Sequence, residues 1–173
     1  MASPPKTADA ALRHDELGRE AGVSARDHQA VRLWLRLLAC STQIEQHIRA
    51  QLRTQFATTL PRFDYLAQLD RHPQGLRMKS LSSHLMVTGG NVTGLTDQLV
   101  VEGWVERLED PEDRRAMIVR MTPAGRDWFA QMAVEHERWL VDAFRGLGAR
   151  DMAQLHALLG SLRQSLARET RQG

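Results

Sequence analysis

The stretch from Met78 to Pro123 constrains this chain of 173 residues more than any other part of it. A short helical pattern opens the stretch, and a second runs from Thr88 to Gly103, a residue typical of a helix end. At helical spacing, one stripe of the second helix is formed by Val92, Leu95, Thr96 and Leu99. A strand, a turn and a return strand then follow, in residues 104–108, 109–113 and 117–121. The stretch therefore predicts two helices and a β-hairpin.

The opposite face of the second helix is small and hydrogen-bonding. At about 100° per residue, this face carries Gly90, Thr93, Gly94, Asp97 and Gln98. A thin polar helix of about four turns fits a DNA major groove and can hydrogen-bond to base edges. Thr88 is a good N-cap, and the glycines of the first turn leave backbone N–H groups open to a phosphate. An ordinary surface helix carries the same pattern, so the helix alone does not distinguish a DNA-binding helix from a surface helix. The hairpin that follows supplies the further evidence.

The hairpin favours a nucleic-acid-binding fold. Its tip carries Arg114 and Arg115, where a wing can reach an adjacent minor groove. The negative potential of that groove favours arginine. A helix-turn-helix followed by a hairpin tipped with arginine is a winged helix. Asn91, Thr93 and Gln98 are the base-edge or phosphate contacts that we expect from the helix, and Arg115 is the contact that we expect from the wing.

The segment from Leu108 to Gly125 resembles the wing signature of the MarR family of transcriptional regulators. That signature has the form Asp-x-Arg, a short strand, then Leu-Thr-x-x-Gly, and the matching residues are Asp113, Arg115, Thr122 and Gly125. Met121 replaces the usual leucine. Val-Glu-Gly-Trp-Val-Glu-Arg, residues 101–107, resembles the family's Glu-x-Gly-Leu-Val-x-Arg, and residues 59–66 resemble its second-helix opening.

The resemblance implies a homodimeric, ligand-responsive repressor that binds double-stranded DNA. Arg115 would lie in the minor groove, with Asp113 holding it, and the dimer would bind a pseudo-palindromic operator. The resemblance also implies a small-molecule effector, an aromatic acid or its coenzyme A thioester. The reason is that Leu-Pro-Arg-Phe-Asp, residues 60–64, and Gly-Gly-Asn-Val-Thr-Gly, residues 89–94, look like stretches of regulators of aromatic-acid degradation. The family often has arginine where this chain has Gly94, so the preferred operator should differ.

The expected fold is mainly α with a small β wing. Residues 1–24 are rich in alanine, proline and charge and predict a flexible arm. A single MarR-like domain is expected over residues 25–173. Its long terminal helices, within 25–57 and 123–170, form the dimerisation part, and residues 58–122 form the winged helix-turn-helix. The first of these helices has a broad apolar face and is longer than a monomer core of this size needs.

Composition excludes several classes of protein. No nucleophile elbow, phosphate-binding loop or dinucleotide fingerprint occurs, so an enzyme and a bound cofactor are not expected. No apolar run approaches the roughly 18 residues of a membrane span, and the first residues carry no hydrophobic signal core. We therefore expect a cytoplasmic protein with no membrane contact.

Charge gives little support to DNA binding. The net charge is only +2. Residues 76–122 hold six Lys and Arg against seven Asp and Glu, so the expected DNA-reading part is about neutral. A winged helix used for protein–protein contact is therefore the competing class of function.

Two other kinds of sensor occur in the family. Cys40 is the single cysteine, and no basic residue closer than Arg36 flanks it, so a small buried thiol is expected rather than a redox centre. The best local group of metal ligands is Cys40, Glu45 and His47, which does not make a site, and no metal is expected.

An organic effector needs an apolar slot and a cation or hydroxyl donor. By chain position, the candidate polar groups are Arg36, Ser41, Arg62 and His84, and the candidate walls are Trp34 and Phe63. For each of them, an ordinary surface or interface residue is the alternative.

Overall fold

The computed structural model describes residues 29–85, 89–111, 113 and 116–169. These residues divide into two compact units, within Met1–His47 and Ile48–Gly173. The helices are α2 (Gln29–Phe56), α3 (Leu60–Asp70), α4 (Met78–Leu85), α5 (Gly89–Val101), α6 (Pro123–Ala143) and α7 (Ala149–Glu169), and the strands are β1 (Leu76–Arg77), β2 (Val105–Glu109) and β3 (Met117–Met121). The predicted fold class, mainly helical with a small β wing, is confirmed.

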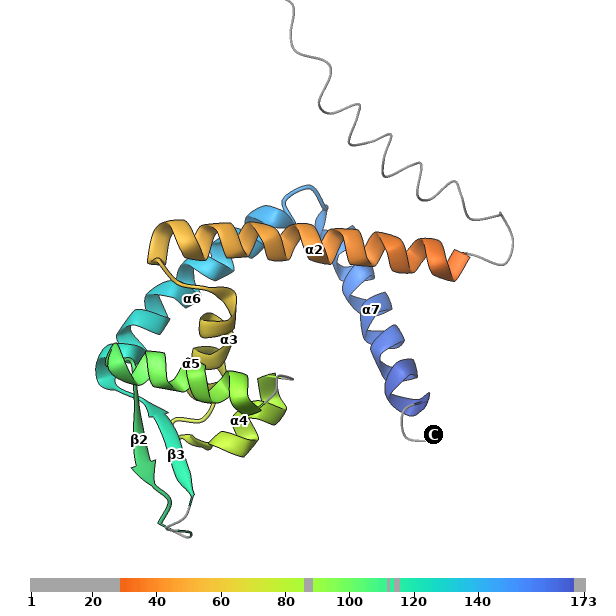
Figure 1. The fold of residues 1–173 in the computed structure, drawn as a ribbon. Coiled ribbons are helices and arrows are strands. Elements are labelled where there is room, and N and C mark those ends of the chain that lie inside the picture. Colours follow the sequence, from red (N-terminus) through yellow and green to blue (C-terminus); the bar gives the residue numbers. More distant parts are fainter. Residues whose placement is uncertain (1–28, 86–88, 112, 114–115, 170–173) are drawn as a thin grey trace, which may run out of the picture. The chain divides into compact units, whose positions relative to one another are not determined.

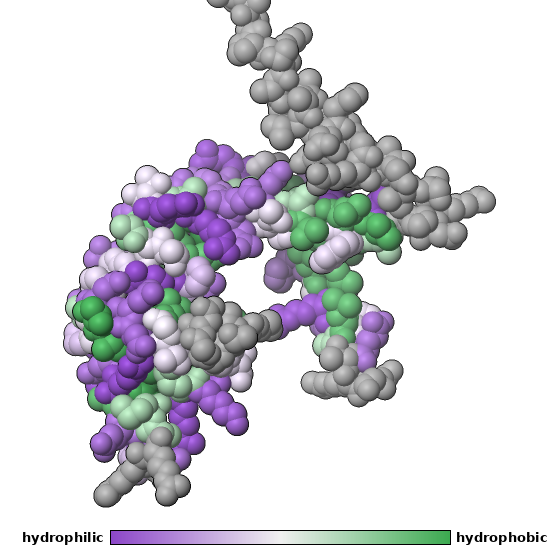
Figure 2. Space-filling view, in the orientation of Figure 1, coloured by the Kyte–Doolittle hydropathy of each residue, from purple (hydrophilic) through white to green (hydrophobic). Residues whose placement is uncertain are grey.

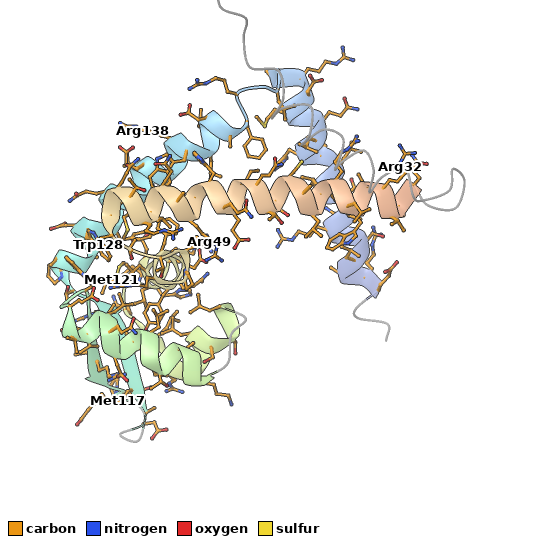
Figure 3. All side chains as sticks on the ribbon, turned by 45° about the horizontal axis from the view of Figure 1, so that its top comes forward. Arg32, Arg49, Met117, Met121, Trp128 and Arg138 are labelled. Atoms are coloured by element: carbon orange, nitrogen blue, oxygen red, sulfur yellow. The ribbon has the colours of Figure 1, made fainter. Side chains whose placement is uncertain are left out.

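The sheet confirms the predicted wing, and a third strand joins it. β2 and β3 form an antiparallel hairpin, with Glu106 opposite Arg120 and Leu108 opposite Ile118. β1 pairs with the other edge of β3, which gives the order β1-β3-β2. Figure 3 shows Met117 at the outer end of β3, and Met121 at its inner end near Trp128. The wing thus projects from a base that is built into the rest of the unit.

Helix ends follow the local signals with one exception. Thr122 accepts a hydrogen bond from the backbone N–H of Gly125 at 3.0 Å, and Pro123 occupies the first turn of α6, as predicted. Gly103 has a φ of +79°, which suits a glycine after the end of α5. Thr59 stands at the N-cap position of α3, where a threonine predicts a capping hydrogen bond, but its side chain makes none.

The hydrophobic core of the second unit joins the winged helix to α6. Its fully buried side chains include three residues of the predicted stripe of α5, Val92, Thr96 and Leu99, which are at most 1% exposed. Leu95, the fourth residue of that stripe, is half-buried. Aliphatic and aromatic residues from α2, α3, α4, the sheet and α6 complete the core: Ile48, Leu52, Phe63, Tyr65, Leu66, Leu69, Leu81, Val105, Val119, Met121, Phe129, Met132 and Trp139. Burial of one apolar stripe therefore fixes which face α5 presents to solvent.

A close backbone contact holds the start of α6 against the start of the wing. A side chain at Gly125 would place its Cβ only 1.9 Å from the carbonyl oxygen of Trp104, so only glycine fits. Thr122 donates to the carbonyl oxygen of Gly103 at 2.7 Å, and its backbone N–H donates to that of Trp104 at 3.1 Å. Thr122 and Gly125, the Thr-x-x-Gly of the wing signature, thus hold the start of α6 against the start of the wing.

The tryptophans are less buried than their place in or near long helices suggested. Trp139 is 6% exposed, whereas Trp34 is 59% exposed. Trp104 and Trp128 are half-buried and stack on each other, with ring centroids 4.5 Å apart. Three of the four tryptophans lie in or next to the long helices, a placement that predicts burial, but of the four Trp139 alone is buried, so that prediction is wrong.

Candidate nucleic-acid interface

A buried hydroxyl chain sets the orientation of α5. The side chain of Thr96 donates to the carbonyl oxygen of Val92 at 2.7 Å, so the hydroxyl of Tyr65 is the donor in its own 2.7 Å bond to Thr96. Both side chains are fully buried. Burial raises the pKa of Tyr65 to about 12, which keeps the hydroxyl protonated as the donor. Helix α3 thereby holds α5 by a polar contact as well as by packing.

The face of α5 that this contact leaves in solvent is the one that the sequence predicted. Thr93, Gly94, Asp97 and Gln98 are all exposed. Gly90 and Asn91 belong to the same helix, while Thr88 lies outside the described residues. The described part of the face carries no bulky side chain in its first two turns, so a groove of nucleic acid meets no steric obstacle there.

Asp97 is not a free acid on this face. Arg107 of β2 donates to its carboxylate, so the pair ties the recognition helix to the wing. Asp97 is 55% exposed and Arg107 is 32% exposed. The sequence analysis proposed Asp97 as a DNA contact and did not foresee its partner. Their spacing of 10 residues, from a helix to the following strand, gave no periodic signal.

Gln98 differs from Asp97 in having no side-chain partner. Its amide is exposed and makes no hydrogen bond to any other residue that the structure describes. Gly94, beside it on the helix surface, has open space where a Cβ would stand, with no atom within 4 Å. The amide of Gln98 is therefore available to a ligand that approaches this face.

The turn of the wing is closed by its backbone. The N–H of Asp110 donates to the carbonyl of Ala116, the N–H of Asp113 donates to that of Asp110, and the N–H of Ala116 donates to that of Asp113. Asp113 is exposed, whereas Arg114 and Arg115 lie outside the described residues. The expected contact between Asp113 and Arg115 therefore stays a prediction.

Asp110 is a residue of the wing that sequence reasoning missed. Its side chain is 2% exposed, and Arg77 of β1 donates to its carboxylate. A buried carboxylate needs such a partner, because removal from water disfavours its charge. The sequence offered one usable signal, an aspartate placed directly before Pro111 in an otherwise exposed turn. The pair anchors the turn to the strand that precedes α4.

Ion pairs occupy half of the basic residues in the expected DNA-reading part, residues 76–122. Arg120 donates to Glu106 at 2.7 and 3.0 Å across the wing, in addition to the pairs made by Arg77 and Arg107. Three of the six basic residues counted in residues 76–122 thus have carboxylate partners within the winged helix. Any attraction for phosphate has to come from the remaining cations and from helix N-termini.

The proposed effector residues of the second unit lie at the start of α3. Arg62 donates to the carboxylate of Glu102, which also accepts from Nε1 of Trp104 at 2.9 Å. The Nε of Arg62 is buried and has no hydrogen-bond partner among the described residues. Phe63 is 7% exposed. The Nη2 of Arg62 is thus paired with Glu102, whereas its Nε is not paired within the described residues.

Phe63 belongs to an aromatic cluster that joins α3 to α6. Its ring lies 5.4 Å from that of Phe129 and 4.6 Å from that of His136, measured between centroids. Trp139 contacts His136 and Phe56 edge-on, at 6.4 and 6.2 Å. Burial lowers the pKa of His136, so the neutral imidazole is favoured within the cluster. The sequence analysis proposed Phe63 but missed His136, which lies 73 residues further along the chain.

The remaining candidates belong to the first unit or have side chains that are not described. Trp34, Arg36 and Ser41 are exposed residues of α2, and the side chain of His84 lies outside the described set. Whether they join Arg62 and Phe63 in one site stays a prediction. Cys40 is exposed, so the expectation of a buried thiol is wrong for the single chain. Residues 29–47, the described part of the first unit, include no buried residue.

Among the described residues, no group of three or more His, Cys, Asp and Glu is placed to hold a metal ion. None of the described helices combines the length and the apolar content needed to cross a lipid bilayer.

The chain is similar to proteins of one family. The model of the MarR family matches residues 58–117. A MarR family transcriptional regulator from Silicibacter pomeroyi is 33% identical, with a TM-score of 0.70 over 83% of this chain and 99% of that one. A mutant MarR from Escherichia coli, solved in complex with operator DNA, has the same fold, with 24% identity and a TM-score of 0.67 over 80% of this chain and 99% of that one.

A curated relative matches over a shorter part. YkoM, an uncharacterized HTH-type transcriptional regulator of Bacillus subtilis, is 32% identical over 89 residues, which is 51% of this chain and 56% of YkoM. The match thus spans just over half of that relative. These proteins are regulators and not enzymes, in agreement with the sequence analysis. Because it shares its fold and 33% of its residues with a regulator that it covers almost end to end, this chain belongs to the MarR family.

Proposed function

We propose that the protein is a homodimeric, sequence-specific DNA-binding regulator of transcription that works in the cytoplasm. The observation that carries this proposal is the exposed face of α5. A buried bond between Tyr65 and Thr96 holds the helix, and an ion pair ties it to the wing. The outward residues Thr93, Gly94, Asp97 and Gln98 are small or polar. A helix presented in this way suits a major groove, and the hairpin beside it suits the backbone or the minor groove. The operator complex of a protein with the same fold supports this reading.

Uncovered apolar surface supports the dimer. Helix α7 has no buried residue, although one of its faces carries Met152, Leu155, Leu159, Leu162 and Leu166. Their spacing alternates between three and four, as in the contact seam of a coiled coil. Figure 2 shows green, apolar atoms gathered along this helix. A second copy of the chain would cover this face, and a twofold dimer would present two copies of α5 to a pseudo-palindromic operator.

The finer proposal concerns control by a ligand. The protein would repress its target until an aromatic acid, or the coenzyme A thioester of one, binds. The start of α3 supports this idea, because the buried Nε of Arg62 has no hydrogen-bond partner in the described part of the chain and Phe63 is part of an aromatic cluster. Trp34, Arg36, Ser41 and His84 complete the proposed effector residues. The effector lowers DNA affinity only to the extent that it discriminates between two arrangements of the recognition helices.

Fluorescence anisotropy tests the proposal. The labelled probe is DNA that flanks the protein's own gene, titrated with and without a panel of aromatic acids and their thioesters. Tight binding that one compound releases supports the regulator and identifies its effector. Binding that no compound changes contradicts the aromatic effector but keeps the regulator. Absence of specific binding contradicts the DNA-binding function.

A second candidate is a winged helix that contacts another protein. The nearly zero net charge of residues 76–122 favours this function, and Arg77, Arg107 and Arg120 all have carboxylate partners. The two functions differ in their response to salt. Contacts to DNA phosphates release counterions and give a steep dependence of affinity on salt concentration, which a neutral protein interface does not.

A further inference from the structure

The centre of the exposed face of α5 is bare backbone. At about 100° per residue, Gly94 lies between Asp97 on one side and Gln98 on the other. A Cβ at Gly94 would meet no atom within 4 Å, so no neighbouring element requires glycine there. Glycine also weakens the interior of a helix. Its place at the middle of the outward face therefore calls for an explanation other than packing within the chain.

Asp97 and Gln98, the two longer polar side chains beside Gly94, differ in their hydrogen bonding. The carboxylate of Asp97 accepts from Arg107, which occupies it and directs it toward the wing. The amide of Gln98 is exposed and has no side-chain hydrogen bond within the described residues. Of this pair, only Gln98 offers both a donor and an acceptor to an incoming ligand.

We propose that Gln98 reads an adenine in each operator half-site, and that Gly94 is the residue that lets it come near enough. This inference rests on the proposed DNA-binding function. The major-groove edge of adenine presents the N7 acceptor beside the N6 donor. A glutamine amide matches that pair with its own donor and acceptor, whereas guanine presents two acceptors and is the usual partner of arginine.

Gly94 determines how closely the helix approaches the bases. Without a side chain at this position, the axis of α5 comes nearer to the floor of the groove, and the glutamine side chain spans the remaining distance. An arginine at this position would fill that space and would itself reach a base. The pattern of Gly94 beside Gln98 therefore specifies an A·T pair where a longer residue would specify a different one.

Selection of binding sites from a random DNA pool tests the proposal. The proteins are the wild-type chain, Gln98→Ala, Gln98→Glu and a matched control, Gln131→Ala, which removes an exposed glutamine of α6. The wild type and the control should enrich the same pseudo-palindrome, with adenine at one fixed position of each half. Gln98→Ala should lose that preference, on the order of tenfold in relative affinity, and should retain the preferences elsewhere.

Gln98→Glu adds a change that a merely structural role would not produce. A carboxylate accepts a hydrogen bond and donates none, so it should prefer the N4 amino group of cytosine at the same position. Circular dichroism of each variant should match that of the wild type, because Gln98 is exposed. An unchanged adenine preference in both Gln98 variants would overturn the proposal while the DNA-binding function stands. A wild-type protein that enriches no sequence would overturn both.

Gly94→Arg gives an independent test of the second half of the proposal. The open space at Gly94 accommodates the side chain, so the variant should fold. It should weaken the adenine preference and introduce a preference for guanine at a neighbouring position. A variant with the same selected sequence as the wild type would show that α5 does not approach the bases at Gly94.

Discussion

The hydroxyl of Tyr65 donates a 2.7 Å hydrogen bond to Oγ1 of Thr96, and both side chains are fully buried. Tyr65 belongs to α3, and Thr96 lies on the inward face of α5. Because Thr96 gives its own proton to the carbonyl of Val92, the bond has one direction only. This contact fixes both the position and the rotation of the helix that we propose to enter DNA.

The two ends of this bond should not be equivalent in their effect on stability. Tyr65→Phe removes a donor and leaves Thr96 bonded to Val92, so it should cost about 0.5–1.5 kcal/mol. Thr96→Val leaves the tyrosine hydroxyl buried without an acceptor and should cost about 1–3 kcal/mol. Urea unfolding measures both. The double variant should recover part of the loss of Thr96→Val, and equal costs for the two single variants would contradict the assigned direction of the bond.

Two arginines of the same sheet should differ in what they contribute to stability. Arg77→Ala removes a partner of Asp110, whose side chain is 2% exposed, and should cost about 1–3 kcal/mol. Arg120→Ala is the matched control, because its partner Glu106 is 37% exposed and the pair is screened by solvent. It should cost less than about 1 kcal/mol. Thermal unfolding of both variants would decide, and a larger loss for Arg120→Ala would refute the anchoring role of Asp110.

A charge in the apolar seam of α7 should separate the proposed dimer. Leu159→Glu places a carboxylate among Met152, Leu155 and Leu162, where its desolvation disfavours association. The control is Gln164→Glu, which adds the same charge about 140° away from Leu159 around the helix. Sedimentation equilibrium should show a monomer for the first variant and a dimer for the control. A dimer in both would move the interface away from this seam.

Stability should fall in acid partly because of His136. Burial lowers the pKa of the folded imidazole below the ordinary histidine value of 6.5, so the unfolded chain takes up a proton more readily. The contribution of the neutral ring is present above pH 6.5 and is lost as the pH falls from there through the lowered pKa of the folded state. His136→Phe keeps an aromatic ring beside Phe63 and cannot be protonated.

The measurement is the difference in unfolding free energy between pH 7.5 and pH 5.5, about one unit either side of the ordinary pKa of histidine. The variant should lose less stability than the wild type over this interval. The carboxylates titrate in both proteins and cancel in the comparison. Equal losses in the two proteins would remove His136 as a source of acid sensitivity.

Arg115→Ala should weaken operator binding by about 1–3 kcal/mol and leave the dimer intact. The reason is the loss of one cationic contact that the resemblance to the family implies for the wing. A gel-shift titration measures the affinity, and sedimentation confirms the dimer. An unchanged affinity would exclude the wing tip from the DNA contact.

The elements of the winged helix could be predicted from local signals. Helical spacing placed the buried stripe of α5, Gly103 marked its end, and Thr122 with Pro123 marked the start of α6. Each of these signals acts within a few residues, where capping and periodicity are decided. The predicted bounds of the return strand, residues 117–121, agree with those of β3.

The contacts that hold the site together could not be predicted in the same way. Tyr65 and Thr96 are 31 residues apart, and Arg77 and Asp110 are 33 apart. Pairing over such distances depends on how the elements pack, which no periodicity records. For the same reason, the contact of His136 with Phe63 could not be predicted. The ion pair of Asp97 with Arg107 could not be predicted either, so Asp97 was proposed as a DNA contact.

The salt dependence of DNA affinity tests the central claim most directly. Anisotropy titrations of the wild-type protein on its selected operator would be run over a series of salt concentrations. Contact with several phosphates predicts a linear fall of log affinity with log salt, with a slope of about −0.9 for each phosphate neutralised. A slope of several units would support a winged helix that binds DNA. A slope near zero, or no specific binding at any salt concentration, would contradict it and favour a surface for another protein.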